Sequence, residues 1–210
     1  MYLPAAFEEK RPEALHALIT AHPLGTVVTH GPEGLDANHI PFELEPTQGP
    51  HGTLRAHVAR ANPVWQRAAD QPVLAIFQAD DAYISPNWYP SKAEHHKHVP
   101  TWNYAVVHVH GVLRVRDDER FLRGLLARLT RTHEARSQQA RPWKMGDAPT
   151  EHIDALLQVI VGIEIEITRV VGKFKLGQNR EPRDRLGAAD GLARQGHAAL
   201  SQAMRDADPH

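Results

Sequence analysis

Hydrophobic and polar positions alternate most clearly across residues 163–168, where isoleucine is followed each time by Glu or Thr. This two-residue period is typical of a β-strand with one buried face. Residues 53–59 alternate in the same way and predict a second such strand. Residues 170–176 are also rich in apolar positions, and we expect them to form a separate strand that pairs with residues 163–168.

Other segments complete a predicted sheet with helices around it. Four further runs rich in apolar residues predict strands; they are residues 24–29, 35–44, 73–77 and 104–115. Apolar residues spaced three or four apart predict helices; they fall within residues 8–21, 61–69, 119–129, 153–157 and 192–204. Residues 91–98 are polar and irregular, which favours a surface loop. Six or seven short strands without βαβ alternation indicate a mainly antiparallel α+β fold, with a sheet large enough to close.

Length and composition narrow the class of protein. The chain has 210 residues, no Cys, and 24 Lys or Arg against 25 Asp or Glu, which gives a net charge of −1. This length favours one domain. No run of about 20 apolar residues is present and the first residues lack a signal-peptide pattern, so we expect no membrane segment. The absence of Cys excludes disulfides and fits the cytoplasm. A net charge near zero is unfavourable for a protein whose main task is to bind DNA.

The segment 52–63 holds the most informative candidate chemistry. A half-buried strand delivers His57 and Arg60 next to the start of a helix, where Asn62 is a candidate cap and Pro63 suits the first turn. The planar fork of an arginine and the free N–H groups of a helix start both suit phosphate. The segment is therefore either a phosphate-binding corner or an ordinary surface arginine beside a cap.

Other motifs leave alternatives open. Aromatic residues beside prolines in residues 83–89 and 99–104 either frame a flat ligand or pack the core. The 15 histidines include the run 94–98, which is a loose metal motif or a solvated loop, and we expect no metal site. The basic run 173–180 either closes a ligand site or forms a solvated turn. The arginines of residues 120–136 spread around a helix, which favours a solvated face over a nucleic-acid contact.

Taken in order, the motifs resemble the PaiB family of FMN-binding negative transcriptional regulators. The resemblance covers the chain to about Met204. The motifs that carry it are Met1-Tyr2-x-Pro4-x-x-Phe7, His39-x-Pro41-Phe42, His57-Val58-Ala59-Arg60-Ala61-Asn62-Pro63-x-Trp65, Ala82-Tyr83-Ile84-Ser85-Pro86-x-Trp88-Tyr89, Val99-Pro100-Thr101-Trp102-Asn103-Tyr104, Ile160-Val161-Gly162-Ile163-Glu164-Ile165 and Lys175-Leu176-x-Gln178-Asn179-Arg180. Two positions depart from the family: Asp80-Asp81 replaces a usual Gly-Pro pair, and Gly177 replaces a usual Ser.

The resemblance implies a split β-barrel related to pyridoxamine-phosphate oxidases, with FMN as cofactor. It also implies a homodimer that holds the flavin in grooves at the subunit interface. We expect one such domain over residues 1–210, with a helical extension from about residue 181. The site residues that it implies are Ala37, Asn38 and His39 beside the isoalloxazine, His57, Val58, Ala59 and Arg60 at the phosphate, and Asn103 and Gln178 from the partner subunit.

Three functions are compatible with these observations. The first is a flavin-binding regulator that represses genes, either by contacting DNA or through another regulator. The second is a flavin-dependent oxidoreductase or flavin reductase, for which Tyr104 and His39 are the nearest candidates for acid–base chemistry. The third is a haem-binding protein that uses some of the histidines. Bound FMN would be expected in the first two.

Overall fold

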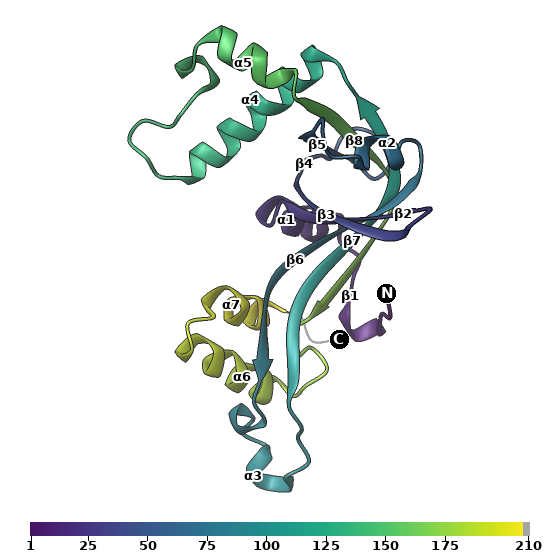
Figure 1. Ribbon diagram of the computed structural model, residues 1–210. Helices are drawn as coiled ribbons and strands as arrows, with labels where there is room; N and C mark the ends of the chain where they lie inside the picture. The colour runs from purple at the N-terminus through teal and green to yellow at the C-terminus, as the bar shows by residue number, and fades with distance from the viewer. Residues whose placement is uncertain (208–210) are drawn as a thin grey trace. The chain divides into compact units, whose positions relative to one another are not determined.

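The computed structural model describes residues 1–207, so residues 208–210 of the predicted extension lie outside the described part. Eight strands form one sheet in the order β3-β2-β6-β7-β8-β5-β4, and β1 pairs with β8 (Figure 1). The pairings of β2 with β3 and β6, of β5 with β4 and β8, and of β1 with β8 are antiparallel. The prediction of a mainly antiparallel α+β fold is therefore confirmed.

The three longest strands are β6, β7 and β8. The strands are β1 (Glu8–Glu9), β2 (Leu24–Gly31), β3 (Gly34–Pro41), β4 (Glu43–Glu45), β5 (Thr53–Ala59), β6 (Pro72–Ile84), β7 (Thr101–Arg116) and β8 (Ile160–Lys175). Within residues 1–207 no pairing joins the two ends of the order, β3 and β4. The sheet is therefore not closed, although the number of strands had suggested closure.

Helices occupy most of the remaining chain. The α-helices are α1 (Pro12–Ala21), α2 (Val64–Arg67), α3 (Lys92–His95), α4 (Glu119–Arg136), α5 (Thr150–Leu157), α6 (Pro182–Arg194) and α7 (Ala198–Asp206). The short 3₁₀ helices are η1 (Ala5–Phe7), η2 (Pro86–Trp88) and η3 (Met145–Asp147). None of the helices within the described residues is long and apolar enough to cross a membrane.

The chain divides into two compact units. The first comprises residues 1–22, 77–107 and 171–207, and the second comprises residues 23–76 and 108–170. In the second unit the alternation predicted for β5 and β8 is observed, because Leu54 lies opposite Ile165 and Ala56 opposite Ile163, and all four are buried. The β5 bounds match the predicted strand because one face of it is buried along its whole length.

Helices α6 and α7 lie side by side in the first unit (Figure 1). Their apolar residues form a core with the ends of β6 and β8; it comprises Ala82, Ile84, Tyr89, Leu176, Ala188, Ala189, Leu192, Leu200 and Met204. Residues 192–204 were predicted as one helix, but Gly196 at φ +88° ends the first helix and lets a second begin.

Two other predictions were wrong in detail. Residues 170–176 are not a separate strand, because β8 continues without a turn to Lys175. Gly172 does not interrupt it: an added Cβ would lie 2.2 Å from Leu15 Cδ2, so this glycine allows α1 to pack closely. The polar segment 91–98 contains the one-turn helix α3 instead of being wholly irregular.

Candidate functional site

The residues predicted for the flavin site fall in both units. Ala37, Asn38 and His39 lie on β3, and the range 57–60 lies at the end of β5, all in the second unit. Asn103 on β7 and Gln178 after β8 belong to the first unit. The two groups are therefore described separately.

The three β3 residues occupy the end strand of the sheet order. His39 lies opposite Thr26 of β2, and Ala37 and His39 are exposed. Asn38 is fixed from two sides: its Nδ2 donates to Asp36 Oδ2 (3.2 Å), and its Oδ1 accepts from Asn62 Nδ2 (2.8 Å). The structure thus brings this part of β3 against the residue that precedes α2.

Pro63, and not the predicted Asn62, holds the cap position of α2, but the side chain of Asn62 still bonds the first residue of the helix. Its Oδ1 accepts a hydrogen bond from Val64 N at 2.9 Å. The side chain of Asn62 is therefore shared between β3 and the start of α2, and it occupies the first free N–H of that helix. An anion at this helix start would have to displace it.

The guanidinium of Arg60 is hydrogen-bonded to other residues of the chain. Its Nη1 and Nη2 donate to the two carboxylate oxygens of Asp117 (2.8 and 2.7 Å), Nε donates to Gln158 O (2.9 Å), and Nη2 also donates to Ile160 O (3.0 Å). The hydrogen bond from Arg60 lowers the pKa of Asp117, and the same bond raises the pKa of Arg60. Four of the five donors of an arginine are thus in use.

Residues 57–59, which precede Arg60, offer a ligand few polar side-chain atoms. Val58 is buried and paired with Val161 in the core, whereas Ala59 is exposed but has no polar side-chain atom. His57 is partly buried, its Nδ1 has no hydrogen-bond partner among the described residues, and burial lowers its pKa. Within the described residues, His57 Nδ1 is the buried side-chain polar atom that has no hydrogen-bond partner.

Most polar groups of this corner are thus bound within the chain, and its role as the phosphate site stays a prediction. A phosphate monoester carries close to two negative charges at neutral pH and needs several donors. Here four of the five donors of Arg60 and the N–H of Val64 at the start of α2 are already bonded to groups of the chain itself. The residues can still line the edge of a planar ring, because Ala37 and His39 are exposed beside Asn38.

In the first unit, Asn103 and Gln178 are buried and hold the chain together. Asn103 Nδ2 lies 3.3 Å from Met204 Sδ. Gln178 accepts from Leu176 N (2.8 Å) and donates to Phe174 O (2.7 Å), which closes the turn after β8. Gly177 sits in this turn at φ +87°, a conformation in which the Ser usual in the family would be strained.

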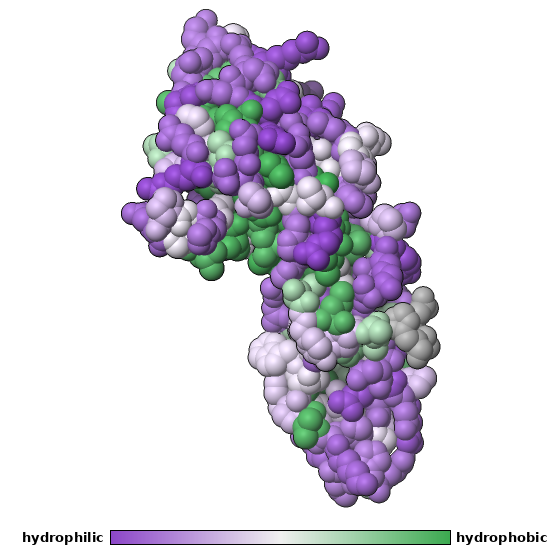
Figure 2. Space-filling model, turned by 90° about the vertical axis from the view of Figure 1, so that its right-hand side faces the viewer, coloured by the Kyte–Doolittle hydropathy of each residue, from purple (hydrophilic) through white to green (hydrophobic). Residues whose placement is uncertain are grey.

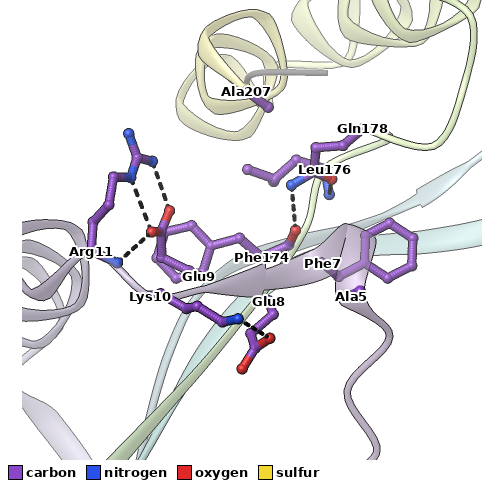
Figure 3. A pocket seen from close by; sticks show the side chains of 10 residues that line it. All are labelled: Ala5, Phe7, Glu8, Glu9, Lys10, Arg11, Phe174, Leu176, Gln178 and Ala207. Carbon is purple, nitrogen blue, oxygen red and sulfur yellow. Dashed lines mark hydrogen bonds and ion pairs between the residues drawn. The ribbon is translucent and has the colours of Figure 1, made fainter. Parts of the chain in front are cut away.

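A pocket of about 450 Å³ adjoins Gln178 in the first unit (Figure 3). Its apolar wall includes Phe7, Phe174 and Leu176. Its charged groups are paired with each other: Arg11 donates to Glu9 with both Nε (3.0 Å) and Nη2 (2.7 Å), and Lys10 pairs with Glu8. The volume suits a small molecule, but the paired charges leave no surplus positive charge for a phosphate.

The histidine motifs do not assemble a metal centre in the described part of the chain. No group of three or more His, Cys, Asp or Glu side chains there could hold an ion. His95 and His98 instead lie with their ring centroids 4.7 Å apart. His110 contacts Arg169 at 3.0 Å.

The family described as "Putative FMN-binding domain" matches residues 1–169 of the chain. The chain belongs to this family. The predicted cofactor, FMN, is thereby confirmed, and so is the resemblance to PaiB. The chain is 28% identical to protease synthase and sporulation protein PAI 2 of Bacillus subtilis, over 91% of this chain and 89% of that protein. It is 32% identical to an uncharacterized protein of Emericella nidulans, over 91% and 90%.

Solved structures agree with the fold. The chain is similar to the FAD and heme binding protein from Mycobacterium smegmatis, with a TM-score of 0.55 and 17% identity over 81% of this chain and 74% of that one. It is also similar to the flavocytochrome Anf3 from Azotobacter vinelandii, with a TM-score of 0.51 and 15% identity over 81% and 70%. These likenesses, with the antiparallel sheet, confirm the predicted split-barrel fold class with peripheral helices.

Proposed function

We propose that the chain is a PaiB-type regulator that binds FMN and lowers transcription as a cytoplasmic homodimer. The observation that carries this proposal is the membership of residues 1–169 in the FMN-binding family, together with the PAI 2 relative that spans nearly the whole chain. The absence of Cys fits a reducing compartment. One domain over the whole chain, with α6 and α7 as its extension, is the organisation we propose.

The homodimer is supported by exposed apolar residues of β2 and of the end strand β3. Leu24 at the start of β2 is 62% exposed and Leu35 of β3 is 75% exposed. On the face shown in Figure 2 the surface is mostly hydrophilic, and hydrophobic residues reach it in patches. Size-exclusion chromatography with light scattering tests the dimer: Leu35→Glu should shift the wild-type dimer towards monomer, and a monomeric wild type would contradict it.

Direct contact with DNA has weaker support than flavin binding. The net charge is −1, and two arginines of α4 are paired with acids: Arg123 with Glu119 and Asp154, and Arg128 with Glu43. We therefore propose that regulation runs through another regulator or through a ligand-dependent contact. A mobility-shift titration against the upstream region of its own gene, at several salt concentrations, tests this. A sequence-specific, salt-dependent shift at submicromolar protein would show direct binding instead.

Flavin binding itself is tested by the absorbance of the purified protein and by titration with FMN. We expect a yellow protein or saturable quenching of FMN fluorescence. Absence of both would contradict the proposed function. Anaerobic addition of NADH or NADPH to the loaded protein separates a regulator from a flavin reductase, since only a reductase bleaches the flavin with one of these donors.

A further inference from the structure

The second unit contains a pocket that none of the residues predicted for the flavin lines. It lies between the second half of α4 and the residues that follow this helix on the way to α5 (Figure 1). We call it the α4 pocket. Its volume is about 340 Å³. Pockets for small molecules span roughly 300–1,000 Å³, so this one has room for a compact ligand.

One wall of the α4 pocket is a segment that turns back along the helix. Directly after α4, Gln138 adopts a left-handed conformation at φ +54°. The returning segment is fixed to the helix because Trp143 N donates to Glu134 Oε2 at 2.9 Å. One residue later, Lys144 N donates to Asp147 Oδ2 of η3, also at 2.9 Å. Hydrogen bonds of the backbone therefore hold this wall in place.

The lining of the α4 pocket is mainly apolar. Pro142, Trp143 and Met145 contribute to it from the returning segment, and Ala127 and Ala135 contribute from α4. Trp143 is 44% exposed although it lines the pocket, so part of its ring is accessible to a ligand. An indole face and a thioether both make favourable contacts with an aromatic ring. This lining therefore suits a planar aromatic group.

The α4 pocket also contains cations without acidic partners. Arg131 and Lys144 both line it, and both are exposed. In the part of the chain that the structure describes, neither forms an ion pair with a carboxylate. Glu134 is the acidic residue among the lining residues, and it already accepts from Trp143 N. The pocket therefore offers two positive charges against one carboxylate that is hydrogen-bonded within the chain.

The surroundings of the pocket are basic in a chain that is nearly neutral. Residues 127–145 contain five Lys or Arg and one acidic residue, whereas the whole chain has a net charge of −1. Arg128 is paired with Glu43 of β4 at 2.7 Å. His133 and Arg136 lie in the last turn of α4, where positive charge opposes the negative end of the helix dipole. The local field therefore attracts an anion to this part of α4.

We propose that the α4 pocket binds a small aromatic carboxylate, with the ring on Trp143 and the carboxylate facing Arg131 and Lys144. The apolar lining accounts for the ring, and the two cations account for the negative charge. A neutral apolar compound would leave both cations unused, and a cationic one would be repelled by them. This site is separate from the proposed function and does not depend on FMN binding.

The test compares naphthoate with naphthalenemethanol, which has the same ring and no charge. The chain has four Trp, so the indole N–H groups give four NMR signals, and Trp143→Leu identifies the one that belongs to Trp143. With one equivalent of FMN present, naphthoate should shift the Trp143 signal and leave the other three unchanged. It should bind about fivefold more tightly than naphthalenemethanol, because an exposed ion pair contributes up to about that factor in Kd.

Substitutions separate the ring contact from the charge contact. Arg131→Gln and Lys144→Gln should each weaken naphthoate binding by about two- to fivefold and leave naphthalenemethanol binding unchanged. The double variant should bind the two compounds equally. Trp143→Leu should weaken both by similar factors, because it removes the ring contact. The control, Arg120→Gln, removes an exposed arginine of α4 that does not line the pocket, and should change neither affinity. Thermal melts confirm that each variant is folded.

Other occupants of the α4 pocket give different results. A Trp143 signal that does not move at millimolar naphthoate overturns the inference, and so does equal affinity of the wild type for the two compounds. If Trp143→Leu abolishes FMN binding, the pocket belongs to the flavin site. If it turns a dimer into a monomer in size-exclusion chromatography, the pocket is an interface between copies. A signal that responds to a short DNA duplex and not to naphthoate assigns the segment to nucleic acid. Each of these overturns the inference.

Failure of the proposed function is a separate result. A wild type that does not bind FMN contradicts the proposed function. The inference still stands in that case if naphthoate shifts the Trp143 signal and the two cation variants lose the preference for the charged compound.

Discussion

Arg60 and Arg180 are both arginines in basic motifs, but the structure gives them opposite surroundings. Arg60 makes a two-pronged ion pair with Asp117 and two further bonds to backbone oxygens. Arg180 contacts His98 and Tyr89, and its surroundings include Lys175 instead of a carboxylate. The difference shows that the availability of a cation to a ligand depends on its acceptors within the chain, which a local motif does not reveal.

The largest expected effect concerns the hydrogen-bond network that runs from Arg180 through His98 and Ser91 to the buried carboxylate of Asp184. Asp184→Ala removes the acceptor of both Ser91 donors, and the side chains of Asp184 and Ser91 are almost fully buried. We expect the free energy of unfolding to fall by about 3 kcal/mol, because two buried donors lose their partner. Urea denaturation measures this.

The matched control is Asp154→Ala on α5, which removes an exposed partner of Arg123. Its unfolding midpoint should stay within error of wild type. Equal losses for the two variants would show that the network behind Arg180 is no more important than a surface pair.

A second pair of variants compares the helices of the two units. At Gly191 of α6 an added Cβ would lie 2.3 Å from Trp88 Cδ2, so Gly191→Ala should cost about 1–3 kcal/mol through overpacking. At Gly124 of α4 the nearest atom is the flexible end of Arg128 at 3.2 Å. Gly124→Ala should therefore be neutral or stabilising by up to about 1 kcal/mol, because Ala favours a helix. Differential scanning calorimetry ranks the two, and the opposite ranking would contradict the packing described for Trp88.

The pH dependence of stability should report the partly buried histidines of the second unit. Burial lowers the pKa of His57 below its ordinary value of 6.5, so the unfolded chain binds a proton at a higher pH than the folded chain does. Stability should therefore decrease as the pH falls below 6.5, until the folded state also takes up the proton. Burial lowers the pKa of His108 and His110 as well, so His57→Gln should reduce this slope without removing it. An unchanged slope in denaturation from pH 7.5 to 5 would contradict the burial of His57.

The smallest expected effect is that of Asp117→Asn, which leaves Arg60 with a neutral partner. Stability should change little, since the pair is largely exposed. If Arg60 is only a positioning residue, the FMN affinity of this variant should equal that of wild type. A clear increase in affinity would show that Asp117 had been competing with phosphate for Arg60.

Much of the fold could be predicted because it follows from short-range patterns. The alternation in residues 53–59 matched β5, and the apolar spacing in residues 119–129 matched part of α4, which Asp118 caps by accepting from Phe121 N. The continuity of β8 could not be read in this way. The sequence predicted two strands that meet near residue 169, whereas the structure has one strand, and Gly172 within it is explained only by the tertiary approach of Leu15.

The candidate site was less predictable because its decisive contacts are distant in sequence. Arg60 meets Asp117 across 57 positions, and Ser91 meets Asp184 across 93. The basic run 173–180 was recognised as a possible end of a ligand site. The sequence could not show that its cations lack acidic partners, since that depends on every carboxylate in the described part of the chain.

The hydrogen-bond chain behind Arg180 has a direction. Ser91 has one hydroxyl proton and gives it to Asp184, so His98 Nε2 must carry the proton shared with Ser91. His98 Nδ1 is then bare and accepts from Arg180. The imidazole is locked in one tautomer, which nitrogen NMR would record as two distinct ring resonances, one protonated and one not. Because the unprotonated Nδ1 is the acceptor of Arg180, its resonance also reports whether that contact is present.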